Sequence, residues 1–121
     1  PIIATCRGMQ YINVMFGGKL WYHPKLPVNR TRGVDHQVWL VKEQRNIWVN
    51  NYHSDCIYEE GLASCFEPLA IDRENHVVEA YGSDEMKILA LQWHPERRFE
   101  TANAYEETRK IILDFIQKYV K

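Results

Sequence analysis

The chain has 121 residues, 45% of them hydrophobic, and carries a formal net charge of -1 at pH 7. This composition is typical of a folded globular domain, and it excludes disordered, fibrous and membrane-spanning classes. The 15 basic residues are balanced by 16 acidic ones without the basic stripe that phosphate binding demands, so we expect no nucleic-acid partner. We expect residues 1–121 to form one domain.

Three cysteines, at positions 6, 56 and 65, make an odd count without a C-x-x-C pair. This spacing fits neither a secreted disulfide framework nor a zinc ribbon. The first residues lack a signal-peptide pattern, and no apolar run approaches the roughly 20 residues that cross a bilayer. We therefore expect reduced thiols, a cytoplasmic location and no membrane partner.

The first segment, residues 1–5, is apolar and predicts a buried strand. Hydrophobic residues then recur at helical spacing, at Met9, Ile12 and Phe16, and the pair Gly17-Gly18 is a typical helix stop. The predicted local structure is strand, sharp turn, helix. A core strand rarely opens a domain, so we expect upstream residues to be missing from this chain.

Residues 19–35 contain two prolines and a glycine without periodicity and predict a long surface loop. Five apolar segments then predict short strands, at residues 38–41, 47–49, 66–71, 77–80 and 88–93. The last segment begins with Asn103-Ala104-Tyr105-Glu106, which is similar to a capping box, and an apolar face follows it. A closing amphipathic helix is expected there, and the whole order predicts an α/β fold.

Cys6 lies where the first predicted strand gives way to a helix, between the small residues Ala4 and Gly8. A strained turn of this kind presents the nucleophile in α/β-hydrolases. A helix N-terminus offers free N–H groups and partial positive charge, so we expect its position to lower the pKa of the thiol. A buried cysteine that only packs as a small hydrophobe is equally compatible with the local pattern.

His94 and Glu96 follow the last predicted strand, with Pro95 between them. The residue before a proline is driven towards extended backbone. Residues two apart in extended chain point to the same side, so the imidazole and the carboxylate can lie together. This pair has the composition of a general base and the acid that orients it. A histidine at a strand end can also be merely structural, and the combination with Cys6 favours catalysis.

Two motifs together resemble the class I glutamine amidotransferase superfamily. They are Cys6-Arg7-Gly8-Met9-Gln10, continued by Asn13-Val14 and Gly17-Gly18, and Gln92-Trp93-His94-Pro95-Glu96. Within that superfamily, Arg7 and the segment from Asp72 to Ala80 are similar to the γ-glutamyl-γ-aminobutyrate hydrolase branch, whose members are cysteine peptidases acting on γ-glutamyl amides. The matching residues are spread over positions 1–96.

This resemblance implies the C-terminal portion of a flavodoxin-like three-layer α/β sandwich. It implies that Cys6 is the nucleophile, His94 the general base and Glu96 its orienting partner, with the backbone N–H of Arg7 in the oxyanion hole. It also places six residues near the glutamyl group, namely Gln10, Asn50, Asn51, Tyr52, His53 and Ser54. The implied chemistry requires no metal and no organic cofactor.

The catalytic domain of this family also has an N-terminal half, which supplies further parallel strands and a second oxyanion-hole amide. The sequence contains no such half. We therefore expect complete activity to require it as a partner, either within the same domain or as a separate chain.

The implied activity is hydrolysis of a γ-glutamyl amide through a thioester on Cys6, which releases glutamate and an amine. Tyr52-His53-Ser54 instead resembles glutaminase subunits that deliver ammonia to a synthase partner, because the hydrolase branch has a serine and then His-His-Gln there. A third alternative is a catalytically silent binding domain on the same scaffold, since a fold does not establish a function.

The sequence also contains residues that could suggest a phosphate-binding loop or a metal site. Gly17-Gly18-Lys19 suggests a phosphate-binding loop, but the surrounding residues break the required pattern. His36, His53 and His94 could be combined into a metal site, but their spacing matches no known ligand arrangement. We therefore expect neither site.

Overall fold

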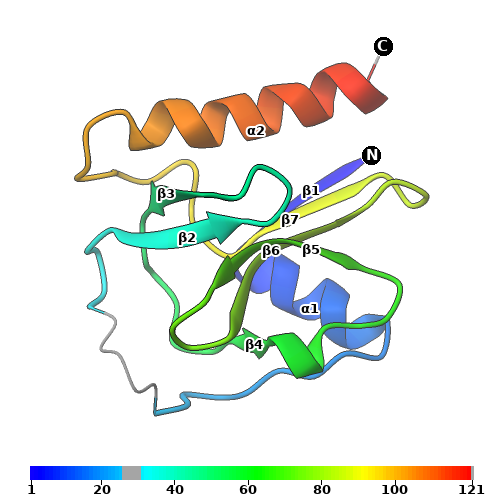
Figure 1. Ribbon diagram of the computed structural model, residues 1–121. Helices are drawn as coiled ribbons and strands as arrows, with labels where there is room; N and C mark the ends of the chain where they lie inside the picture. Colours follow the sequence, from blue (N-terminus) through cyan, green and yellow to red (C-terminus); the bar gives the residue numbers. More distant parts are fainter. Residues whose placement is uncertain (26–30, 121) are drawn as a thin grey trace.

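A mixed β-sheet with one helix on each face forms the framework of the molecule (Figure 1). The computed structural model describes residues 1–25 and 31–120. Its elements are β1 (Ile2–Thr5), α1 (Arg7–Met15), β2 (His36–Leu40), β3 (Arg45–Val49), β4 (Ile57–Tyr58), the short 3₁₀ helix η1 (Glu59–Gly61), β5 (Glu67–Asp72), β6 (Val77–Ser83), β7 (Ile88–Leu91) and α2 (Ala104–Tyr119).

The strand order in the sheet is β1-β7-β6-β5-β2-β3, and β4 pairs with β6 beside this path. Within the described part of the chain, β1 and β7 run parallel and the other named pairs are antiparallel. Thr5 lies opposite Leu91 in the parallel pair. Parallel strands end at the same edge of a sheet, so the segments that follow β1 and β7 emerge together.

Each face of the sheet carries its own hydrophobic core. Met9 of α1 and Tyr81 of β6 belong to the core on one face, and Ile111 and Phe115 of α2 pack against the core on the other. The two helices therefore cover opposite faces of one sheet, as Figure 1 shows. The predicted α/β class with three layers is confirmed.

The strand and helix predictions agree with the structure to within a few residues. The first helix ends at Met15, and Gly17 has a φ of 97°, a left-handed conformation that glycine adopts at low cost. The predicted loop at 19–35 includes residues 26–30, which lie outside the described residues. The sequence reading missed β4 and η1, because a strand of two residues is too short to produce an alternating pattern.

The predicted capping box at the start of the last helix is wrong. Asn103 has a φ of 66° and its side chain makes no capping hydrogen bond, while its backbone carbonyl accepts from Glu107 at 3.4 Å. A capping residue needs extended backbone to aim its side chain at the first N–H groups. The left-handed turn at Asn103 removes that geometry, so the helix begins without this side-chain cap.

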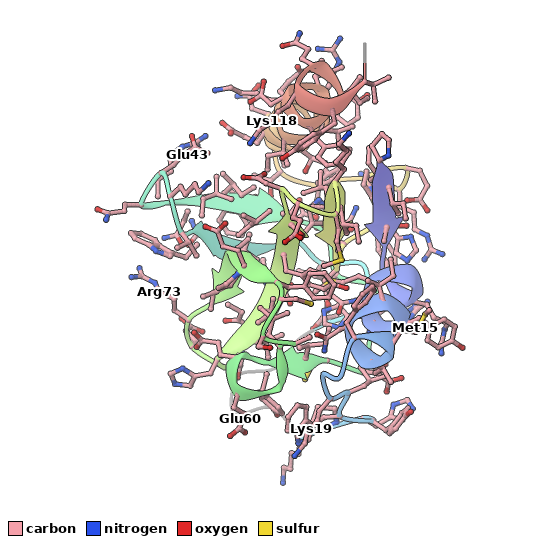
Figure 2. All side chains as sticks on the ribbon, turned by 90° about the vertical axis from the view of Figure 1, so that its right-hand side faces the viewer. Met15, Lys19, Glu43, Glu60, Arg73 and Lys118 are labelled. Carbon is pink, nitrogen blue, oxygen red and sulfur yellow. The ribbon has the colours of Figure 1, made fainter. Side chains whose placement is uncertain are left out.

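Apolar side chains are exposed along β1 and the outer side of α1. Ile2 and Ile3 are partly uncovered, and Met15 is 78% exposed, projecting outwards in Figure 2. Among the described residues, the helices are too short or too polar to cross a bilayer.

Candidate active site

Cys6 forms the turn between β1 and α1. Its backbone has φ 49° and ψ -107°, a conformation that a non-glycine residue adopts only under strain. Its N–H donates to the carbonyl of Leu91 at 2.8 Å, which ties the turn to the end of β7. A Cβ added at Gly8 would lie 3.6 Å from the Cβ of Ala4, an ordinary contact, so the two small residues flanking the turn lie side by side.

The expected activation of the thiol by position alone is wrong. Burial raises the pKa of Cys6 above its ordinary value of 9.0. The backbone N–H of Arg7, the charges of Arg7 and Arg97 and the side chain of Gln92 all favour the thiolate, but together they do not offset the burial. The thiol therefore needs a base or a bound substrate to release its proton.

The His94 and Glu96 side chains meet as their spacing indicates. Nδ1 of His94 lies 2.8 Å from Oε2 of Glu96, and the Glu96 side chain is 63% exposed. Its slight burial acts to raise the pKa of Glu96, but a hydrogen bond from its own backbone and the contact with His94 outweigh this effect and lower it. A carboxylate held in this way fixes which ring nitrogen of His94 carries the proton.

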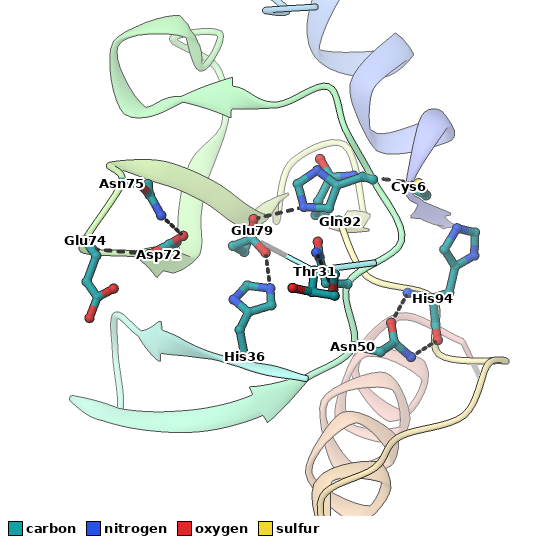
Figure 3. A network of polar contacts seen from close by, with 12 residues as sticks. Cys6, Thr31, His36, Asn50, Asp72, Glu74, Asn75, Glu79, Gln92 and His94 are labelled. Atoms are coloured by element: carbon teal, nitrogen blue, oxygen red, sulfur yellow. Dashed lines mark hydrogen bonds and ion pairs between the residues drawn. The ribbon is translucent and has the colours of Figure 1, made fainter. Parts of the chain in front are cut away.

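The paired strands bring these groups to one edge of the sheet. Nε2 of Gln92 donates to Sγ of Cys6 at 3.7 Å, and Figure 3 shows the His94 ring on the same side as the thiol. The described hydrogen bonds connect the sulfur with Gln92 and not with His94. The direct transfer of a proton between Cys6 and His94 therefore stays a prediction.

Asn50 holds the backbone of His94 in place. Its Nδ2 donates to the His94 carbonyl at 2.8 Å, and its Oδ1 accepts from the His94 N–H at 3.0 Å, as drawn in Figure 3. Its side chain is fully buried. The described contacts of this side chain are thus with the segment that begins at His94, while the predicted contact with substrate stays a prediction.

The other predicted substrate-binding residues are distributed around the same edge. Gln10 is buried and its Nε2 donates to the Asp55 carbonyl at 3.1 Å and to Gln92 at 3.3 Å. The Tyr52 ring meets the His94 ring edge-on, with centroids 6.0 Å apart. Gln10 is therefore linked to the thiol through Gln92, and Tyr52 contacts the imidazole directly.

The remaining three predicted residues differ in exposure. Asn51 is buried and donates to the Thr31 carbonyl at 3.2 Å. The side chain of His53 is only 7% exposed, whereas Ser54 is exposed. The His53 side chain therefore faces the interior, where it contacts Glu79, and Ser54 lies at the surface.

Gln92 and Glu79 also contact the predicted site residues, although no role was predicted for them from the sequence. Glu79 lies between His36 and His53, at 3.2 Å and 3.6 Å. His36 and His53, two of the three histidines considered above for a metal site, thus both contact the carboxylate of Glu79. Figure 3 shows His94 apart from His36 and Glu79. The one available signal was a glutamate inside an apolar strand, since buried carboxylates are rare unless paired.

Residues 1–96 match the model of the family described as Peptidase C26. A glutamine amidotransferase-like protein of Lactococcus lactis is 31% identical over 117 residues, which cover 84% of this chain and 48% of that protein. Component 2 of aminodeoxychorismate/anthranilate synthase from Bacillus subtilis is 27% identical, and the match covers 100% of this chain and 60% of the relative. The chain thus spans about half the length of the relatives it matches.

Solved structures contain the same fold. A glutamine amidotransferase from Thermotoga maritima matches with a TM-score of 0.63 and 18% identity, over 100% of this chain and 50% of that one. At this identity the likeness shows the fold alone. The mixed sheet described above therefore corresponds to about half of such a structure.

Proposed function

Since the chain belongs to the Peptidase C26 family of class I glutamine amidotransferase-like proteins, we propose that it carries the catalytic residues for hydrolysis of a γ-glutamyl amide. Cys6 is the nucleophile of this proposal, His94 the general base and Glu96 the residue that orients it. The products are glutamate and an amine.

One observation carries the proposal, namely the parallel pairing of β1 with β7. Thr5 lies opposite Leu91, and the next residue on the first strand is the strained Cys6. The second strand is followed within five residues by the contact of 2.8 Å between His94 and Glu96. A nucleophile, a base and an orienting acid thus leave the same edge of one sheet, which is the arrangement that covalent catalysis needs.

The chemistry follows from these positions. His94 takes the proton of the Cys6 thiol, and the sulfur attacks the γ-carbonyl carbon of the substrate. The backbone N–H of Arg7 faces the sulfur and stabilises the negative charge that develops on the carbonyl oxygen. His94 then gives its proton to the departing amine, and a water molecule activated by the same imidazole cleaves the thioester.

A second candidate uses the same thioester with glutamine as substrate and passes the ammonia to a synthase partner. The relative from Bacillus subtilis is a synthase component, and one from Campylobacter hominis that is 31% identical is a glutamine-hydrolysing GMP synthase. The segment Tyr52-His53-Ser54 also favours this candidate. The two functions differ in the leaving group and in their dependence on a partner.

The test is mass spectrometry of the complete protein after brief exposure to glutamine and to a panel of substituted γ-glutamyl amides. We expect a glutamyl adduct on the peptide that contains Cys6, and none in Cys6→Ala. Cys65→Ala is the matched control, because it removes an exposed thiol outside the site.

The ranking of the substrates then separates the two candidates. Preference for substituted amides without a partner supports the hydrolase, while preference for glutamine and stimulation by a synthase support the glutaminase subunit. A Cys6→Ala protein that still releases amine at the wild-type rate would exclude both.

A further inference from the structure

A buried carboxylate with two imidazoles lies beneath the candidate site. Oε1 of Glu79 is 3.2 Å from Nε2 of His36, and Oε2 is 3.6 Å from Nε2 of His53. The side chains of His36, Glu79 and His53 are 8%, 2% and 7% exposed. They come from β6, from β2 and from the segment after β3, and Figure 3 shows Glu79 and His36 facing one another in the interior.

A β-bulge aims Glu79 into this position. The pairing of β5 with β6 passes from Ala70–Ala80 directly to Ile71–Val78, so Glu79 has no partner on β5. An extra residue of this kind redirects a side chain and increases the local twist. The carbonyl of Glu79 accepts from the backbone N–H of Gln92 at 2.8 Å, which places the bulge directly behind the residue that contacts Cys6.

The contacts of His53 determine which of its nitrogens carries a proton. Its Nδ1 lies 2.7 Å from the carbonyl oxygen of Asp55, and a carbonyl can only accept, so this nitrogen donates. Its other nitrogen, Nε2, faces Glu79, and it attracts the carboxylate when it carries a proton as well. The same Asp55 carbonyl accepts from Gln10 at 3.1 Å, and Gln10 contacts Gln92. The orientation of His53 is therefore linked to the side chains around the thiol.

Glu79 is ionised within this cluster, and its negative charge attracts the two imidazoles. Burial acts to raise the pKa of Glu79, but the imidazoles of His36 and His53, at 3.2 Å and 3.6 Å, outweigh it and lower the pKa to about 2. An ionised carboxylate enclosed in the interior holds its partners firmly, because separating them would leave a buried charge without compensation.

We infer that Glu79 and His36 are positioning residues, which hold His53 and, through the bulge, Gln92 in the geometry that binds the glutamyl group beside Cys6. This inference rests on the proposed function. Stability alone does not require such a cluster, because well-packed apolar residues of similar volume often replace a buried ion group without loss. The cluster contacts Gln92 through the Glu79 carbonyl, and it is linked to Gln10 through His53 and the Asp55 carbonyl. Apolar residues in its place could not orient the His53 ring.

The test is Glu79→Gln in the complete protein, a change that removes the charge and keeps the shape. Two kinds of measurement are made: steady-state kinetics give KM and kcat for the preferred substrate, and NMR gives the ring nitrogen signals of His53, assigned with His53→Gln. We expect KM to rise by at least about tenfold with kcat changed much less, as for loss of ground-state binding, together with altered His53 signals.

The matched control is Glu59→Gln, since Glu59 contacts His76 at 3.2 Å in an exposed pair that shares no described contact with Glu79 or Cys6. It should leave KM and the His53 signals unchanged. If Glu79→Gln does not fold, His36→Gln provides the same readouts, because it weakens the hold on the carboxylate from the other side.

The outcomes separate this inference from the proposed function. A folded variant with wild-type KM and unchanged His53 signals overturns the positioning role, even if the wild-type protein forms the thioester. An increase in KM without any change in the His53 signals overturns it as well. If the wild type forms no adduct on Cys6, the proposed function fails, and unchanged His53 signals in Glu79→Gln would still refute the inference.

Discussion

Two groups of histidine and carboxylate in this molecule differ in where they lie and how they are assembled. His94 and Glu96 are two residues apart on one segment, at an edge where the carboxylate is 63% exposed. Glu79, His36 and His53 come from three distant segments and are enclosed in the interior. The exposed pair is free to act on a substrate, while the enclosed group can only act through its neighbours.

This difference predicts opposite responses to mutation. In the exposed pair, the loss of a side chain should reduce chemistry and leave the fold intact, because exposed ion pairs contribute little to stability. In the enclosed group, the loss of one member leaves a partner without compensation and should destabilise the protein. Variants of the two groups should therefore differ in whether they lose activity or stability.

The largest effect is expected for His94→Asn. Removing a general acid and base lowers kcat by about 10²–10⁴-fold. The free energy of unfolding should change by about 1 kcal/mol or less, because the Glu96 partner is 63% exposed and solvent screens the ion pair. Steady-state rates of amine release and urea unfolding of the same protein measure both quantities. Activity within about threefold of the wild type would show that His94 is not the base.

The second prediction concerns stability. Glu79→Ala should lower the free energy of unfolding by about 3–5 kcal/mol, because two imidazoles lose their buried partner. Glu96→Ala should lower it by less than about 1 kcal/mol. Urea unfolding followed by tryptophan fluorescence compares the two variants directly. Equal losses in both would remove the distinction between the two groups.

The exposed pair could be predicted from the sequence because its geometry is local. Pro95 and the spacing of two residues place His94 beside Glu96 with no knowledge of the fold. The strand before Cys6 and the glycines after the first helix are equally local signals. The fold class was predictable for the same reason, since alternating apolar segments between two helical patterns indicate an α/β sheet.

The enclosed group could not be predicted, because its geometry depends on tertiary structure. Glu79 is aimed inwards by a bulge, and a bulge is defined by the register between β5 and β6, which no single segment encodes. The pKa of Cys6 was mispredicted for a related reason. Its helix position is a local feature, but the burial that outweighs it comes from the packed chain.

The third prediction is a pH dependence that belongs to the enclosed group. The folded pKa of Glu79, about 2, lies below its ordinary value of 4.5. A depressed carboxyl pKa stabilises the fold above the unfolded value, and this contribution is lost as the pH falls through the folded value. The stability advantage of the wild type over Glu79→Gln should therefore shrink between pH 4.5 and about 2.

Urea unfolding at several pH values measures this advantage, with Glu96→Gln as the comparison from the exposed pair. The Glu96 variant should differ little from the wild type across the same range, since solvent screens its charge. An advantage of the wild type that stays constant down to pH 2 would show that the fold does not lower the pKa of Glu79.

The smallest effect concerns the thiol itself, which belongs to the exposed edge but is partly buried. Its raised pKa means that alkylation of Cys6 should increase with pH and reach half its maximum above pH 9.0 in the absence of substrate. Gln92→Leu should move this midpoint higher, because Gln92 favours the thiolate. Cys65 gives an exposed thiol in the same chain for comparison, followed by mass spectrometry of its own peptide.

A midpoint for Cys6 below that of Cys65 would contradict this prediction. It would mean that a positive charge near the sulfur, such as a protonated His94, outweighs the burial before any substrate binds. The Cys6 and His94 side chains would then form an ion pair at rest, and the proton transfer from thiol to imidazole would precede substrate binding instead of accompanying it.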